Sequence, residues 1–150
     1  MEISGLPLHP LVVHAAVVFG PLGALTALLY AVLSRWRDRL RWPMLVLALV
    51  ATGSVVAAYL TGNSFLESRP ELGQKPLVQT HEERAELLLW LTLGFGVVAV
   101  VAGWLHARAG ALGTVVRVVL GLGAAAVLVQ VVRTGDAGAR AVWEAVLARG

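Results

Sequence analysis

The chain has 150 residues, enough for one domain, and 58% of them are hydrophobic while only 14% are charged. A soluble domain carries about 25% charged residues, so a chain this apolar would expose large hydrophobic patches in water. Its net charge of +3 comes from basic residues spread along the chain, which argues against nucleic-acid binding. Because cysteine is absent, disulfides, thiolate metal sites and covalent c-type haem are excluded within the chain.

Four segments are long and apolar enough to cross a membrane. A hydrocarbon core about 30 Å thick needs roughly 20 apolar residues in a helix. Arg117 is the one charge deep within these segments, and its long side chain can reach the nearby interface. The predicted spans are residues 10–34, 43–65, 81–106 and 109–133. We therefore expect an all-α fold, an integral membrane four-helix bundle formed by residues 1–150 as a single membrane domain.

Local signals predict where the first three helices begin. Pro10 suits the first helical position, where its missing N–H costs nothing, so His9 would lie just before the first helix. Pro43 has the same part in the second helix. Thr80 and Glu83 have the spacing of a capping box, which would place His81 in the first turn of the third helix. Residues 63–79, rich in proline, glycine and charge, are predicted to form the longest loop.

The C-terminal segment is predicted to form a separate short helix. Gly135 suits a helix stop, and Asp136 suits the N-cap of a new helix over residues 137–148. Apolar residues of this segment recur at helical spacing and form one face: Ala139, Val142, Trp143, Val146 and Leu147. Such a helix would lie along the membrane surface.

The distribution of arginine predicts the orientation. Arginines concentrate in residues 35–41 and at Arg108 and Arg117, whereas residues 63–86 carry a net negative charge. Because short cytoplasmic loops are enriched in lysine and arginine, we expect a multi-pass membrane protein with both termini extracytoplasmic. His9, His14 and His81 would then lie near the outer membrane face, and His106 near the inner face.

The three outer histidines are candidate ligands for a cofactor or metal. His9 and His14 are five residues apart, which turns their rings about 140° from one another and prevents them from chelating one ion as an i, i+4 pair would. His81 would lie among helix N-terminal amides. Arg133 and Asp136, near the outer end of the last span, are candidates for a supporting layer around these ligands.

Structural roles compete with these assignments. His9 could cap a helix, His14 could bond a neighbouring helix, and His81 could be a solvated residue of the first turn. Arg133 could extend to the interface, and Asp136 could be a helix cap. Catalytic motifs and acidic residues in the middle of a span are absent, which disfavours an enzyme and a carboxylate proton relay.

Several motifs resemble a widespread bacterial family of four-helix membrane proteins whose function is not established. Its members open with Leu-His-Pro, three variable residues and histidine, which matches residues 8–14. The resemblance continues in Thr61-Gly62, in residues 81–83, in residues 134–139 and at Trp143, so it covers nearly the whole chain. In many relatives the position of Asp136 is histidine, and this departure removes one nitrogen ligand.

The resemblance implies a redox role, because relatives occur joined to Rieske-type or cytochrome-type electron-transfer domains. It implies a b-type haem held by two neutral histidines between helices. The leading prediction is therefore a haem b or transition-metal module near the outer face, with His14 and His81 as favoured ligands and His9 as an additional one. It would need an electron-transfer partner. The alternative is a non-catalytic accessory subunit that packs in the bilayer against partner membrane proteins, as a homo-oligomer or within a larger complex.

Overall fold

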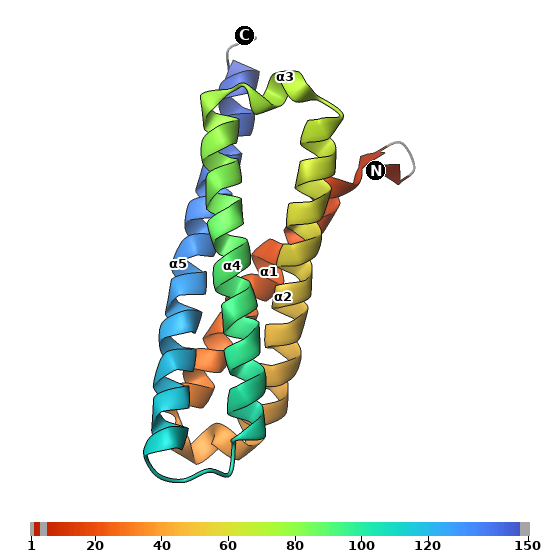
Figure 1. Ribbon diagram of the computed structural model, residues 1–150. Coiled ribbons are helices and arrows are strands. Elements are labelled where there is room, and N and C mark those ends of the chain that lie inside the picture. The colour runs from red at the N-terminus through yellow and green to blue at the C-terminus, as the bar shows by residue number, and fades with distance from the viewer. Residues whose placement is uncertain (1, 4–5, 148–150) are drawn as a thin grey trace.

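Four long helices form the molecule in the computed structural model, which describes residues 2–3 and 6–147. They are α1 (Leu8–Val32), α2 (Arg37–Glu67), α4 (Pro76–Trp104) and α5 (Ala111–Leu147) (Figure 1). Each contains a segment long and apolar enough to cross a membrane. The expected all-α membrane bundle is thereby confirmed.

Short elements complete the described chain. A 3₁₀ turn, η1 (Ser34–Trp36), joins α1 to α2, and α3 (Pro70–Gly73) joins α2 to α4. Two short strands precede α1: β1 (Glu2–Ile3) pairs antiparallel with β2 (Leu6–Pro7), with Glu2 opposite Pro7. The turn between α4 and α5 contains Gly110 with φ +84°, a backbone conformation that glycine adopts without steric cost.

The helices pack in a ring in which α1, α2, α4 and α5 follow one another and α5 closes on α1. α1 and α4 therefore lie diagonally across the bundle. In Figure 1 the bundle is elongated, with α3 at one end and the turn between α4 and α5 at the other. We call these the α3 end and the Gly110 end.

Small residues form much of the bundle's core. Ala24, Ala27, Ala48 and Ala124 are fully buried, around a few larger side chains such as Phe95. A Cβ on Gly23 would lie 2.8 Å from the Leu47 carbonyl oxygen, closer than real Cβ atoms approach. Small residues allow such close contact between helix backbones, which membrane helices use because lipid provides no hydrophobic drive for their association.

Large apolar side chains cover the outside of the bundle. Leu11, Val18 and Leu25 of α1 are exposed at helical spacing, as are Val46 of α2 and Leu122 of α5. An exposed apolar surface of this kind would be unstable in water but is suited to lipid. The exterior thus agrees with the membrane environment predicted from composition.

Three helices begin earlier than the sequence signals suggest. α1 begins at Leu8, so His9 lies within its first turn. α2 begins at Arg37 and contains Pro43.

α4 begins at Pro76, which takes the first helical position after the N-cap Lys75. The capping box at Thr80 is therefore wrong: the Thr80 hydroxyl donates to the Pro76 carbonyl inside the helix. Hydrophobicity predicts the span, but a helix can continue into the polar region beyond it.

The predicted stop at Gly135 is also wrong, because α5 is continuous from Ala111 to Leu147. The separate helix over residues 137–148 is instead the last part of α5, and its final residue lies outside the described residues. A glycine within a helix costs only about 1 kcal/mol relative to alanine, and packing can outweigh that cost. Here α5 packs along α4 on both sides of Gly135, through Gln130 and through Gly138.

Candidate functional site

His9 lies in the first turn of α1 and binds the backbone of α2. Its Nδ1 is 3.1 Å from the Ala58 carbonyl oxygen and 3.3 Å from Thr61 Oγ1. A carbonyl can only accept, so Nδ1 carries the proton and donates. The ring lies against Gly62, where a Cβ would be 3.0 Å from His9 Cε1. The Phe65 ring stacks with the His9 ring, and their centroids are 6.3 Å apart.

His81 repeats this arrangement between α4 and α5. Its Nδ1 donates to the Thr134 carbonyl oxygen at 3.0 Å. Its ring lies against Gly138, where a Cβ would be 3.0 Å from His81 Cε1. Each of the two hairpins, α1–α2 and α4–α5, is therefore closed at the α3 end by one histidine of its first helix bound to its second helix.

Helix geometry explains why a glycine accompanies each histidine. The carbonyl of residue i points along the helix toward residue i+4. Ala58 and Gly62 have this spacing, and so do Thr134 and Gly138. A side chain at the i+4 position would occupy the space through which the imidazole reaches the carbonyl. The sequence analysis missed this role of the two glycines. The only available signal was that each histidine near the start of a helix has a glycine near the end of the apolar segment of the following helix.

The chemical result is the same at both sites. Donation by Nδ1–H fixes the tautomer of a neutral imidazole and leaves the Nε2 lone pair available as an acceptor. Histidines that bind metals are commonly held in this way, with the other ring nitrogen donating to a backbone carbonyl.

His14 has different surroundings. It is exposed on the same stripe of α1 as Leu11 and Val18, and its Nδ1 donates to the Pro10 carbonyl of its own helix at 2.6 Å. As the five-residue spacing predicts, it faces away from the direction of His9. Among the described side chains, no hydrogen bond or ring contact joins His14 to His81. The structure thus gives the inward position on α1 to His9.

A second layer of hydrogen bonds holds α4 to α5 next to His81. Gln130, which is 4% exposed, donates from Nε2 to the Arg84 carbonyl at 2.9 Å. The Thr134 hydroxyl donates to the same carbonyl at 3.1 Å. Arg84 Nη1 in turn donates to the Arg133 carbonyl at 2.9 Å. Arg133 therefore contributes its backbone to this layer, while its side chain is exposed.

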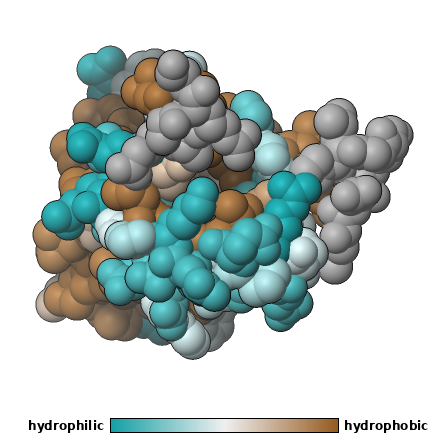
Figure 2. Space-filling model, turned by 90° about the horizontal axis from the view of Figure 1, so that it is seen from above, coloured by the Kyte–Doolittle hydropathy of each residue, from teal (hydrophilic) through white to brown (hydrophobic). Residues whose placement is uncertain are grey.

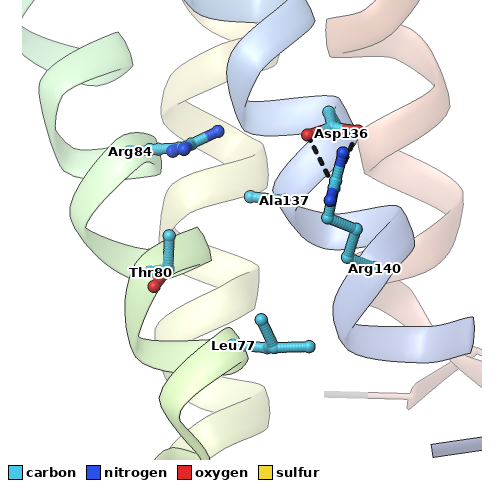
Figure 3. A pocket seen from close by; sticks show the side chains of 6 residues that line it. All are labelled: Leu77, Thr80, Arg84, Asp136, Ala137 and Arg140. Carbon is cyan, nitrogen blue, oxygen red and sulfur yellow. Dashed lines mark hydrogen bonds and ion pairs between the residues drawn. The ribbon is translucent and has the colours of Figure 1, made fainter. Parts of the chain in front are cut away.

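A groove of about 340 Å³ lies between α4 and α5, and its lining includes Thr80, the residue before His81. Figure 3 shows Arg84 extending from α4 toward α5, and Asp136 paired with Arg140 on the facing helix at 2.9 Å. The remaining lining residues are Leu77, Thr80 and Ala137. Asp136 is therefore half of an exposed ion pair in the middle of α5, and not the helix cap suggested by the sequence. Viewed onto the α3 end, hydrophilic side chains gather around apolar ones (Figure 2).

The donor set at this end is limited in number. Within residues 8–143 and 146–147, whose side chains the structure describes, no three His, Asp or Glu side chains converge as a metal site would require. At the α3 end, α1 and α4 therefore each provide one imidazole that is bound to the next helix, His9 and His81.

His106, at the Gly110 end, has both ring nitrogens engaged. Its Nε2 is 2.8 Å from Asp38 Oδ1, and its Nδ1 is 3.0 Å from the Tyr30 hydroxyl. Tyr30 is 1% exposed and also donates to the Ala102 carbonyl at 3.2 Å. A protonated His106 satisfies all three bonds together, since both its nitrogens then donate. This network ties the start of α2 to the ends of α1 and α4, and it leaves His106 without a free nitrogen.

Comparison with known families agrees with this architecture. Residues 5–149 match the model of a family described as a predicted membrane protein (DUF2231). The chain belongs to this family. The match includes all four histidines and every helix of the bundle, and the family is one of unknown function. No curated protein and no solved structure matches the chain significantly.

Proposed function

We propose that the chain is a membrane-embedded redox-cofactor module and that His9 and His81 would hold a b-type haem at the α3 end. The observation that supports it is the shared state of the two rings. Each imidazole donates Nδ1–H to a backbone carbonyl of the next helix, at 3.1 Å for His9 and 3.0 Å for His81. The lone pair of Nε2 would therefore be the one that binds iron.

The donor set fits haem better than a metal ion held by protein alone. A porphyrin supplies four nitrogens, so two histidines complete the coordination of its iron. Four-helix bundles build such sites from side chains of facing helices, and α1 and α4 lie diagonally across this bundle. A protein-only transition-metal site would need a further ligand, for which His14 is the candidate on α1. When bound, haem supplies one-electron transfer.

The residues around the two histidines would orient them and set their surroundings. The Ala58 and Thr134 carbonyls hold the ring planes and tautomers, while Gly62 and Gly138 leave the rings room. Arg84, which lines the groove, would provide positive charge suited to carboxylates such as haem propionates, whereas the charge of Arg140 is already paired with Asp136. An electron-transfer partner would approach the α3 end, where this groove opens.

The same contacts favour a second candidate, a non-catalytic accessory subunit. Each histidine joins two helices of a hairpin, which is a structural result in itself. In this interpretation the imidazoles only hold the two helices of each hairpin together. The apolar exterior packs against partner membrane proteins or other copies of the chain.

Optical spectroscopy separates the two candidates. We expect protein purified in detergent from haem-replete cells to show a Soret band that shifts on reduction with dithionite. His9→Ala and His81→Ala should each abolish the band, whereas the matched variant His14→Ala should retain it. Loss of the band in His14→Ala instead of His9→Ala would assign the α1 ligand to His14.

A colourless wild-type protein without bound iron, copper or zinc, prepared from haem- and metal-replete cells, would overturn the cofactor proposal. The accessory candidate then predicts that His9→Ala and His81→Ala lower the unfolding temperature in detergent, and that a partner co-purifies with the wild-type chain under mild solubilisation.

We also propose that the α3 end and both termini are extracytoplasmic. The arginines of residues 35–41, with Arg108 and Arg117, belong to the Gly110 end, and short arginine-rich segments are typical of the cytoplasmic side.

A further inference from the structure

Arginines at the Gly110 end fall into two groups by burial. Arg35, Arg39 and Arg108 are exposed. Arg37 and Arg41, one turn apart on α2, are half-buried, and so is Arg117 on α5. The second group therefore has part of its charge removed from water, which is unfavourable unless an opposite charge is near.

The half-buried group converges on Tyr30 at the end of α1. Arg37 Nε donates to the Tyr30 carbonyl oxygen at 3.4 Å. The charges of Arg37, Arg41 and Arg117 all act on the Tyr30 hydroxyl. Three guanidinium groups from two helices thus lie near Tyr30, and that of Arg117 also donates from Nη2 to Thr114 Oγ1 of its own helix at 3.1 Å.

Their charge lacks a counterion within the described part of the protein. Asp38 is the one carboxylate whose charge also reaches Tyr30, and it is hydrogen-bonded to His106. No described carboxylate lies within 4.0 Å of any of the three guanidinium groups. The Nε of Arg41 is buried and has no hydrogen-bond partner among these residues. A buried donor of this kind needs a partner from outside the chain, and beside other guanidinium groups without a carboxylate an anion suits that position best.

Guanidinium chemistry and location together identify the anion. The planar fork of arginine matches phosphate oxygens in bidentate hydrogen bonds. The cluster lies at the membrane interface, since Trp42 is exposed and Arg41 lies 5.3 Å from its ring centroid. Val32 and Leu33, 74% and 40% exposed at the end of α1, offer apolar surface for an acyl chain next to the charges.

We propose that Arg37, Arg41 and Arg117 bind the phosphate group of an anionic phospholipid at the Gly110 end. The apolar surface beside the cluster favours a lipid over free phosphate. The site is at the opposite end from His9 and His81, so it stands independently of the proposed cofactor.

Thermal unfolding of the delipidated full chain in detergent tests this site. We expect dioleoylphosphatidylglycerol to raise the unfolding temperature saturably, and dioleoylphosphatidylcholine or inorganic phosphate at equal concentration to leave it nearly unchanged. Arg41→Gln and Arg117→Gln should each weaken phosphatidylglycerol binding about tenfold, the loss expected for one charge-assisted contact. The exposed neighbours Arg35→Gln and Arg39→Gln are the matched controls and should bind as the wild type does.

Three results would overturn the proposal. Equal weakening by the buried and exposed arginine variants would indicate a diffuse charge effect without a site. Stabilisation by inorganic phosphate as large as that by phosphatidylglycerol would assign the cluster to a free anion. Equal retention of phosphatidylglycerol and phosphatidylcholine by the wild-type chain, measured by native mass spectrometry from mixed nanodiscs, would exclude selectivity even if the variants failed to fold.

Discussion

Single residues decide which histidines face the interior of the bundle. His9 and His14 both belong to α1, yet one ring lies against Gly62 of α2 and the other is exposed among leucine and valine side chains. The residue four positions after the accepting carbonyl matters as much as the histidine, because only glycine at that position leaves space for the ring to reach the carbonyl.

We expect Gly62→Ala and Gly138→Ala to destabilise the protein by about 1–3 kcal/mol, since displacing the ring leaves the imidazole N–H without its acceptor. The measurement is unfolding in detergent by circular dichroism. Gly135→Ala is the matched control: nothing lies within 4 Å of its added Cβ, so it should stabilise α5 by about 0.5–1 kcal/mol. Identical behaviour of Gly138→Ala and Gly135→Ala would contradict the assigned contact.

At the scale of elements, each helix extends beyond the span that hydrophobicity predicts. α2 and α4 begin in polar sequence, and α5 continues through Thr134-Gly135-Asp136, a segment whose composition favours a stop. Glycine and aspartate have weak helix propensity, and contacts with α4 outweigh it. Propensity acts within one segment, whereas these contacts come from a helix about 50 residues away in sequence.

The continuity of α5 makes a specific prediction for Gly135→Pro. Inside a continuous helix, proline removes one backbone hydrogen bond and clashes with the preceding turn, so we expect a loss of about 3 kcal/mol or more. At a true helix stop the same substitution would cost little. Unfolding in detergent and far-UV circular dichroism report the change, and a Gly135→Pro protein as stable as the wild type would restore the predicted break.

At the scale of the whole molecule, the two ends of the bundle differ in chemistry. The α3 end carries the imidazoles of His9 and His81, each bonded to the next helix, and a groove with an ion pair. The Gly110 end carries the Tyr30–His106–Asp38 network and the arginine cluster. A membrane protein with such an asymmetry is expected to have one fixed orientation.

Reporter fusions test this orientation. In a bacterial host, alkaline phosphatase fused after Gly150 should be active, because that enzyme matures outside the cytoplasm, whereas green fluorescent protein at the same position should stay dark. An insertion of the phosphatase at Gly110 should be inactive. The opposite pattern would invert the bundle and place the arginine cluster at the outer face.

The sequence by itself determined the membrane environment, the four spans and the presence of histidines near their ends. These follow from hydrophobicity, which adds residue by residue and needs no knowledge of neighbours. It also separated His9 from His14, because that depends only on helical periodicity. It did not reveal the glycines at 62 and 138, the Tyr30–His106–Asp38 network or the unpaired Arg41.

Tertiary structure alone decided those features. The histidine–glycine contacts and the Tyr30–His106–Asp38 network join residues from different parts of the chain, 49 to 76 positions apart, as in His9 with Ala58 and Tyr30 with His106. Such contacts depend on where each helix begins, how it is rotated and which backbone it approaches. Those quantities are set by the packing of small residues across the bundle, and no local pattern in the chain carries them.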